Sequence, residues 1–232
     1  LFPEGCHALA APGAAARDLQ TLGQLAAGLD DAYSVYHGVH WTRVERNNYA
    51  IVGEIDFAIV GPTGKLLLIE QKTGILTETA TGLVKKYASK DKDVAFQMAR
   101  SAEALSERLR KACGGEQVFV DTLLYCPDYT VREPGTAGID PARIVDAKRK
   151  EHLLATIRAI LPPNGEVLPA RPKVHRFLGD ILELVPEVHA VIGGAGALST
   201  RLSGGLAHWA RRIGCEPVPL RVIGTARSGT AL

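Results

Sequence analysis

Two carboxylates precede one short apolar run of this chain, and a carboxylate and a lysine follow the next. Glu54 and Asp56 come before the first run, and Glu70 and Lys72 come after the second. Side chains alternate between the two faces of a strand, so the members of each pair share a face. Converging carboxylates bind Mg²⁺ or Mn²⁺ through oxygen, and such a metal can activate water against a phosphodiester. A neighbouring lysine can orient that water or stabilise the charge that develops on the phosphate.

A turn rich in glycine and proline separates the two apolar runs. The segments 57–60 and 66–69 have the composition of strands, and Gly61-Pro62-Thr63-Gly64-Lys65 lies between them. Glycine and proline at this place are a hairpin signal. We therefore expect the hairpin to bring its acidic and basic ends together.

The hairpin resembles that of the PD-(D/E)xK nuclease superfamily. Asp56, a gap of thirteen residues and then Glu70-x-Lys72 follow the superfamily pattern. The longer text is similar to the nuclease-related domain (NERD) branch: Gly-Glu-Ile-Asp, an apolar run, Gly-Pro-x-Gly, a second apolar run and Ile-Glu-x-Lys-Thr-Gly. The resemblance covers about residues 14–160. It implies an α/β fold of the restriction-endonuclease-like kind, with a central mixed β-sheet flanked by helices.

The resemblance also implies roles for individual residues. Asp56 and Glu70 would ligate Mg²⁺ or Mn²⁺, and Glu54 would be an auxiliary ligand or lie just behind the ligands. Lys72 would position water or stabilise the transition state, and Gln97, on a later helix, would orient substrate or water. Two alternatives stay open: the hairpin can carry ordinary solvated charges, and Gln97 can be an exposed helix residue.

PD-(D/E)xK folds usually carry a further acid on the first helix, and Asp18 lies near that place. An aspartate in the first turn of a surface helix is favoured by the helix dipole alone, and we prefer that interpretation. His37 and His40 lie in a predicted strand. Carboxylates suit Mg²⁺ better than imidazoles do, so neither histidine belongs to the predicted site.

Composition indicates one large domain, or one domain with an extension, in a chain of 232 residues. No apolar run approaches the ~20 residues of a membrane helix. The four cysteines lack CxxC spacing, so we expect reduced thiols in a cytoplasmic protein and no zinc site. The net charge of +2 does not by itself predict nucleic-acid binding. Basic clusters at 85–92, 108–111 and 148–150 are either phosphate contacts or solvated faces.

Hydrophobic periodicity predicts the elements around the hairpin. Helices are expected over 14–29, 93–112, 146–161, 175–184 and 198–213, with Asp146 capping the third. Strands are expected over 33–41, 117–126 and 144–145, with one or two more between 73 and 89. The predicted domains are an irregular N-terminus (1–13), the nuclease-like domain (14–161), a linker (162–172) and a helical extension (173–232).

The C-terminal text carries a partial phosphate-binding motif. Gly224 and Gly229 have P-loop spacing, but Thr230 stands where the lysine should be. With Arg201-Leu202-Ser203-Gly204-Gly205-Leu206-Ala207 and Pro219-Leu220-Arg221-Val222, this text resembles the start of the ATPase core of UvrD/Rep-type superfamily-one helicases. ATP would be a cofactor only if the parent protein has a complete motor. A plain glycine-rich tail, or an artificial join in the chain, is the alternative.

Together these patterns predict a Mg²⁺- or Mn²⁺-dependent deoxyribonuclease that acts on single- or double-stranded DNA. A helicase motor would lie in cis, and no membrane partner is expected. One alternative is a non-catalytic nucleic-acid-binding or recruitment module, which would bind DNA with a steep salt dependence and without metal. Another is the N-terminal part of an ATP-dependent helicase whose motor is the enzyme.

Overall fold

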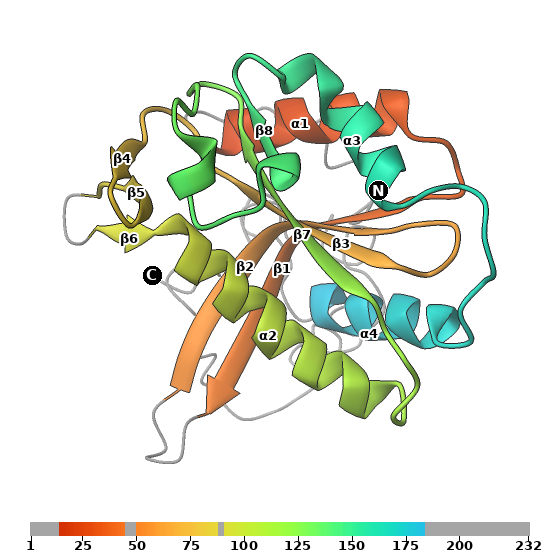
Figure 1. Ribbon diagram of the computed structural model, residues 1–232. Coiled ribbons are helices and arrows are strands. Elements are labelled where there is room, and N and C mark those ends of the chain that lie inside the picture. The colour runs from red at the N-terminus through yellow and green to blue at the C-terminus, as the bar shows by residue number, and fades with distance from the viewer. Residues whose placement is uncertain (1–13, 45–49, 88–90, 184–232) are drawn as a thin grey trace, which may run out of the picture. The chain divides into compact units, whose positions relative to one another are not determined.

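A computed structural model describes residues 14–44, 50–87 and 91–183 (Figure 1). The helices are α1 (Ala14–Gly28), α2 (Val94–Ala112), α3 (Leu153–Ile160) and α4 (Arg171–Glu183). The strands are β1 (Ser34–Val44), β2 (Ala50–Val60), β3 (Leu66–Gln71), β4 (Thr77–Thr79), β5 (Gly82–Lys85), β6 (Lys92–Asp93), β7 (Val120–Cys126) and β8 (Ile144–Asp146). Short 3₁₀ turns lie at Pro134–Thr136, Pro141–Arg143 and Lys150–His152. The chain divides into two compact units, the first of which ends at Phe177.

A five-stranded mixed sheet with the order β1-β2-β3-β7-β8 forms the centre of the first unit. The pairs β1–β2 and β2–β3 are antiparallel, whereas β3–β7 and β7–β8 are parallel. Parallel neighbours need a long crossover, and the chain from β3 to β7 supplies it through β4, β5, β6 and α2. The predicted α/β fold, a mixed sheet flanked by helices, is confirmed.

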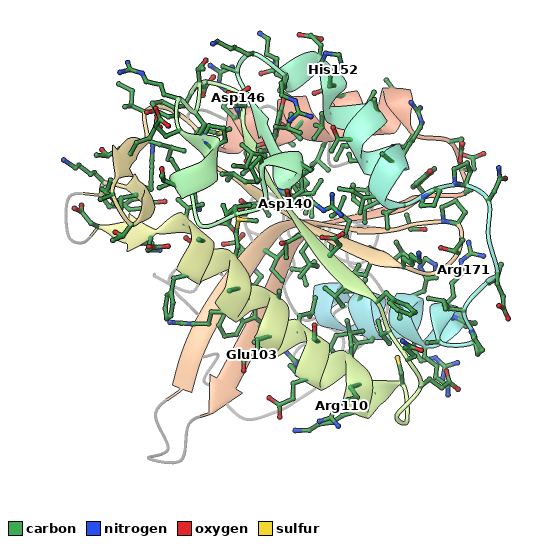
Figure 2. All side chains as sticks on the ribbon, viewed as in Figure 1. Glu103, Arg110, Asp140, Asp146, His152 and Arg171 are labelled. Atoms are coloured by element: carbon green, nitrogen blue, oxygen red, sulfur yellow. The ribbon has the colours of Figure 1, made fainter. Side chains whose placement is uncertain are left out.

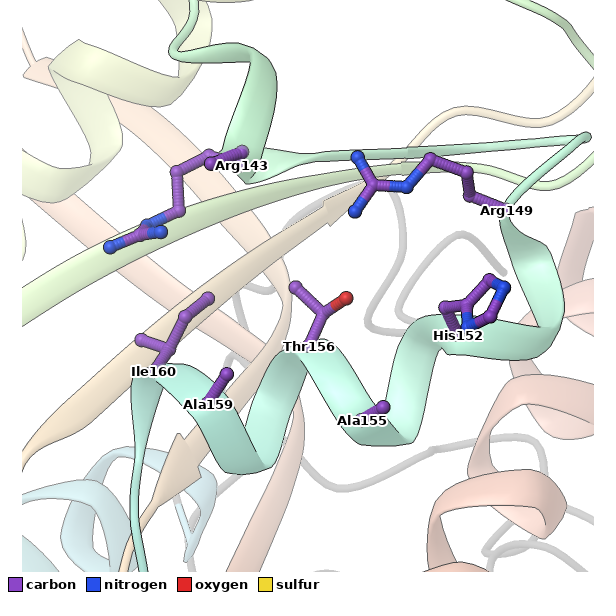
Figure 3. A pocket seen from close by; sticks show the side chains of 8 residues that line it. Arg143, Arg149, His152, Ala155, Thr156, Ala159 and Ile160 are labelled. Carbon is purple, nitrogen blue, oxygen red and sulfur yellow. The ribbon is translucent and has the colours of Figure 1, made fainter.

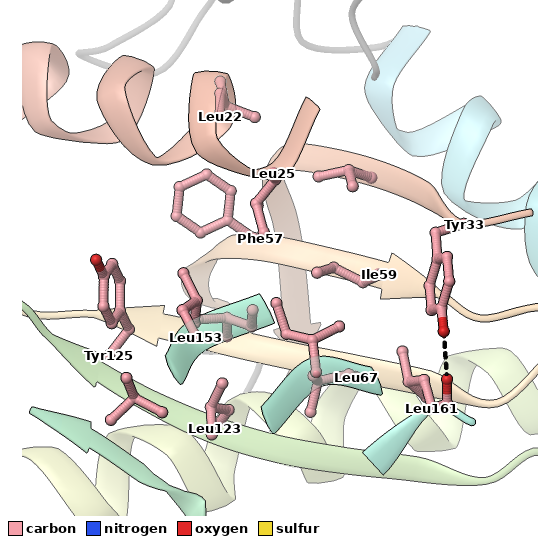
Figure 4. Close-up of a cluster of buried hydrophobic side chains, with 14 residues drawn as sticks. Leu22, Leu25, Tyr33, Phe57, Ile59, Leu67, Leu123, Tyr125, Leu153 and Leu161 are labelled. Atoms are coloured by element: carbon pink, nitrogen blue, oxygen red, sulfur yellow. Dashed lines mark hydrogen bonds between the residues drawn. The ribbon is translucent and has the colours of Figure 1, made fainter. Parts of the chain in front are cut away.

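The face of the sheet that carries α1 and α3 holds the main hydrophobic core (Figure 4). Both helices and the central strands contribute fully buried side chains, among them Leu22, Leu25, Phe57, Leu153 and Ile157. At the rim of this core the Tyr33 hydroxyl donates to the Leu161 carbonyl at 2.8 Å. Burial of each such apolar side chain contributes about 1.5–3 kcal/mol, so this cluster holds α1 and α3 against the sheet.

Helix α2 crosses the opposite face of the sheet (Figure 1). Asp93 caps it, because the carboxylate accepts the N–H of Phe96 at 2.8 Å. Leu105 and Leu109 of α2 are fully buried. Strands β4, β5 and β6 form a separate three-stranded sheet. A second apolar cluster joins the start of α2 to this small sheet and to β7 through Leu76, Leu83, Val94, Met98 and Leu124. The start of α2 is therefore held close to the end of β3.

The predicted hairpin is confirmed. All residues of β3 are buried, since this strand lies between β2 and β7. The turn closes through the N–H of Gly64, which donates to the Gly61 carbonyl at 2.9 Å. Gly64 has a φ of +89°, a conformation that glycine adopts without a Cβ penalty.

Asp146 does not cap a helix, so that prediction is wrong. It ends β8 (Figure 2), and its carboxylate accepts the backbone N–H groups of Val131, Lys148 and Arg149. The helix begins later, at Leu153, and its N-cap residue His152 makes no side-chain cap bond. The buried aspartate is occupied with the loops that follow β7 and β8, a tertiary role that local spacing does not reveal.

The segment expected to be a linker contacts the hairpin turn. The Leu168 N–H donates to the Thr63 carbonyl at 2.8 Å, and Ala170 is buried. Helix α4 then begins at Arg171, earlier than predicted. The domain boundaries remain predictions. The irregular N-terminus, the helix over 198–213, the P-loop-like segment and the helicase resemblance lie outside the described residues. In the described part no helix is long and apolar enough to cross a membrane.

Candidate active site

Asp56 and Glu70 stand opposite each other on β2 and β3. The register pairs Phe57 with Ile69, so the next pair along the hairpin is Asp56 with Glu70. The Gln71 N–H donates to Asp56 Oδ2 at 2.6 Å, which ties the strands together beyond the last regular pair. Residues directly opposite in an antiparallel ladder share a face, so the two carboxylates converge.

Lys72 and Gln97 both donate to one oxygen of Glu70. The Lys72 ammonium pairs with Glu70 Oε1, and Gln97 Nε2 on α2 donates to the same oxygen at 2.6 Å. Glu70 and Lys72 are each 5% exposed, so the pair is almost completely desolvated. The backbone of Lys72 is fixed just beyond β3, because its main-chain N–H donates to the Tyr125 carbonyl at 2.8 Å. Gln97 is therefore a part-buried partner of Glu70 and not an exposed helix residue.

Glu54 shares the face of Asp56 on β2 but leans toward the neighbouring strand. Its Oε1 lies 3.9 Å from His40 Nε2, and His40 is its partner across β1 and β2. The charge of Glu54 still contributes to raising the pKa of Glu70. Its position is that of an auxiliary group, one step away from the Asp56–Glu70 pair.

Asp18 lies beside the site, although its spacing favoured an ordinary surface position. Its Oδ1 accepts the side-chain N–H of Gln71 at 2.8 Å, and Gln71 Oε1 accepts the Thr21 hydroxyl at 2.6 Å. The charge of Asp18 also helps to raise the pKa of Asp56. One signal could have found it: Asp18 precedes Leu22 by one helical turn, so it lies on the buried side of α1.

Burial sets the protonation of the two carboxylates. Burial and the charge of Glu70 raise the pKa of Asp56 to about 8, against the opposing effects of Lys72 and the Gln71 N–H. Burial likewise raises the pKa of Glu70, although the Lys72 charge opposes it. Carboxyl groups shifted this far are typical of functional sites and are not expected of a solvated hairpin.

Lys72 remains a cation in this environment. Burial lowers its pKa, but the charge of Glu70, their hydrogen bond and the charge of Asp56 raise it by more. The net shift is upward, so the ammonium form is retained throughout the neutral range.

The donor set fits a hard divalent cation. Gln97 Oε1 is buried without a hydrogen-bond partner, which leaves an oxygen available beside Glu70. Gly38 stands opposite Asp56 with a φ of +66°, and a Cβ there would come within 3.7 Å of Glu54 Oε1. No three His, Cys, Asp or Glu residues of the described part are gathered as a metal site. Mg²⁺ binds through one or two carboxylates and keeps several waters, so Asp56 and Glu70 are sufficient protein ligands.

A separate hollow of about 370 Å³ lies over α3 (Figure 3). Arg143, Arg149, His152 and Thr156 line it, together with small apolar side chains. The Arg143 guanidinium is already bonded to both oxygens of Asp121. None of the lining residues comes from β2, β3 or α2, so this hollow is not part of the carboxylate site.

A mixed sheet with a buried carboxylate–lysine group at the end of its central hairpin is an α/β arrangement consistent with a nuclease-like fold. Residues 13–127 match the family model NERD, the nuclease-related domain. That range contains α1, the hairpin, α2 and every predicted site residue, so the resemblance to this domain is confirmed. No curated protein and no solved structure matches the chain.

Proposed function

We propose that this chain is a nuclease domain that hydrolyses DNA phosphodiester bonds with Mg²⁺ or Mn²⁺. The observation that supports it most is the buried group in which Asp56 faces Glu70 while Lys72 and Gln97 bond Glu70. Asp56 and Glu70 would hold the metal, with Glu54 as the auxiliary ligand. The bound metal would supply a Lewis acid for the phosphate and lower the pKa of a coordinated water.

Lys72 would stabilise negative charge on the phosphate that is attacked. Its raised pKa keeps it protonated, so it does not serve as a general base. Glu70 holds the ammonium and the Tyr125 carbonyl holds the backbone N–H of Lys72, and a fixed charge in a desolvated site requires no reorganisation during reaction.

Gln97 would position a water molecule. Its amide N–H is committed to Glu70, and its carbonyl oxygen is buried without a partner. That oxygen can accept a hydrogen bond from a water held between Gln97 and the carboxylates. Gln71 has a related task from the other side, since it joins Asp18 through its side chain and Asp56 through its backbone.

Cleavage of supercoiled plasmid and of linear single strands tests the proposal directly. The purified chain would be incubated with Mg²⁺, with Mn²⁺ and with EDTA, beside Asp56→Asn and Lys72→Ala. Lys111→Ala is a matched control, because Lys111 is an exposed lysine of α2 paired with Glu107. We expect metal-dependent nicking by the parent and the control, and a loss of about 100-fold or more in the two site variants.

Two results would decide against the proposal. Folded site variants that cut at the parental rate would exclude these residues from the chemistry. A parent that binds DNA with a steep salt dependence but never cuts would favour the recruitment module. The helicase motor in cis, its need for ATP and a cytoplasmic location remain predictions that this assay does not address.

A further inference from the structure

Large apolar side chains are exposed next to the carboxylate site. Among the described residues, those most exposed are Ile75 (79%), Phe96 (66%), Val167 (56%), Tyr87 (45%) and Phe119 (42%). Ile75, Tyr87 and Phe96 belong to the crossover between β3 and β7, the segment that also supplies Lys72 and Gln97. Exposed large apolar side chains on a segment that also carries site residues are candidates for ligand contact.

Tyr87 lies between β5 and α2, the helix that supplies Gln97. Lys92 Nζ stands 5.2 Å from the centre of its ring, a cation–π arrangement. Tyr87 is near enough to Lys72 to influence its pKa, and Lys92 is near enough to Glu70 to influence that of the carboxyl group. The Tyr87 ring and Lys92 therefore lie on the segment that leads from β5 into α2 and Gln97.

Phe96 lies in the first turn of α2. Its N–H is fixed by the Asp93 cap, and the next residue, Gln97, points to Glu70. Phe96 itself is two-thirds exposed, so its ring extends from the same turn into solvent. Ile75 is the third exposed apolar residue of this crossover, and its carbonyl accepts a hydrogen bond from Lys85 at 3.2 Å.

Cationic side chains lie on the same crossover segment as Tyr87 and Phe96, which suits a ligand with many negative charges and flat apolar rings. Lys86 and Lys92 are exposed, and the Arg100 guanidinium lies 5.4 Å from the Trp41 ring centre farther along α2. Cations that follow a backbone, beside aromatic rings that take the base faces, form the usual surface for single-stranded nucleic acid. In a duplex the base faces are covered by their neighbours, so exposed rings can reach them only where a strand is unpaired.

We propose that Tyr87 and Phe96 stack on unpaired bases and thereby direct unpaired DNA, a single strand or a frayed end, to the carboxylate site. The inference rests on the proposed function for the identity of that site. The stacking itself is a binding property, and it can be measured without metal or cleavage.

The test is fluorescence anisotropy in EDTA with a labelled oligodeoxythymidine, the same length of abasic strand and a blunt duplex. The parent should bind the strand with bases at least about tenfold more tightly than the abasic strand or the duplex. Tyr87→Leu and Phe96→Leu should each lose about tenfold in affinity for the strand with bases and little for the abasic strand. Tyr87→Phe keeps the ring and should bind as the parent does.

Phe119→Leu is the matched control. Phe119 is also an exposed ring with a lysine above it, Lys65 at 5.8 Å, but it precedes β7 at the end of the sheet far from Glu70. Equal binding of the abasic strand and the strand with bases, or an equal loss in Phe119→Leu, would overturn the inference. Preference for the duplex would overturn it too. Failure of the nuclease proposal would appear separately, as a parent that stacks bases in this assay and cuts no plasmid with metal.

Discussion

At the scale of single residues, the Glu70–Lys72 pair is the feature whose removal should disturb the apoprotein most. Both side chains are 5% exposed, so removing the lysine leaves a buried carboxylate without its counter-charge. Breaking a buried pair from one side costs about 3–5 kcal/mol, whereas replacing both partners by neutral groups is often tolerated. We predict that Lys72→Met is strongly destabilised at pH 8 and that Glu70→Gln with Lys72→Met recovers much of the loss.

Urea denaturation in EDTA measures this difference in the free energy of unfolding. Lys111→Met is the comparison, because the Lys111–Glu107 pair is exposed and should contribute less than about 1 kcal/mol. If the double variant were no more stable than Lys72→Met, the pair would not be the source of the loss.

Gln97 allows a second prediction at the same scale. Gln97→Leu removes the unpartnered carbonyl together with one of the two donors to Glu70, while Lys72 still bonds that oxygen. We expect unfolding free energy to change by no more than about 1 kcal/mol and the rate of metal-dependent cleavage to fall by about tenfold. Plasmid nicking at saturating DNA, beside a melting curve, separates the two effects. A cleavage loss that merely follows a lower melting temperature would assign Gln97 a structural role only.

The site residues divide into those that local patterns reveal and those that only the folded chain reveals. Asp56, Glu70 and Lys72 were predictable to lie together, because alternation and the hairpin turn are local properties. The role of Asp146 was not, since its carboxylate bonds loops distant in sequence, and Asp18 was indicated only by its spacing from Leu22 on α1. A carboxylate's partners depend on tertiary neighbours, which residue spacing does not encode.

At the scale of elements, Gly53 of β2 leaves space for the ring of Trp41, and Trp41 in turn contacts α2. A Cβ at Gly53 would lie 2.3 Å from atoms of the Trp41 ring, and the indole N–H of Trp41 donates to the Ser101 hydroxyl at 3.3 Å. Glycine in a strand marks such close approaches. We predict that Gly53→Ala displaces Trp41 and costs about 1–3 kcal/mol.

Gly23→Ala is the same chemical change as Gly53→Ala, but we expect it not to destabilise the protein. Gly23 lies within α1, and a Cβ there would meet nothing within 4 Å. Alanine is favoured over glycine in a helix by about 0.5–1 kcal/mol, so this variant should be at least as stable as the parent. Thermal melts of both variants check the pair, and similar losses in the two would refute the role assigned to Trp41.

Element prediction succeeded where a signal is local and failed where an end is set from outside. The apolar stripe and the Asp93 cap fix α2, and the Gly-Pro turn fixes the hairpin. The start of α3 is different, because Lys150–His152 forms a 3₁₀ turn and no side chain caps the helix. Nothing in the sequence around Asp146 indicates that its carboxylate is held by Val131 on another loop.

At the scale of the whole molecule, the fold places its least favourable charges where three elements meet. Asp56 on β2 faces Glu70 on β3 and Lys72 just after that strand, and Asp18 on α1 adds its own charge. Folding therefore raises the pKa of Asp56 from its ordinary value of 3.8 to about 8. Under the proposed function, metal binding would release this proton, because a carboxylate must be deprotonated to act as a ligand.

This shift predicts how stability depends on pH in the metal-free protein. Between the two pKa values the native state binds a proton that the unfolded state does not, so Asp56 stabilises the fold fully below its unfolded value. That contribution is lost as pH rises toward about 8. The unfolding free energy should fall between pH 6.5 and 8, with a slope of at most about 1.4 kcal/mol per pH unit for one proton.

The window between these pH values lies away from the shifted histidine and cysteines, and Glu70, whose pKa burial also raises, is common to the two proteins compared. His175 has a lowered pKa, because burial disfavours its cation, so it changes protonation state below its ordinary pKa of 6.5. Burial raises the pKa of Cys113 and Cys126, so both thiols lose their protons only above their ordinary pKa of 9.0. Urea denaturation in EDTA at several pH values would compare the parent with Asp56→Asn, which cannot titrate there. A parent that becomes more stable as pH rises, or a variant with the same slope as the parent, would show that Asp56 is already ionised in the folded protein.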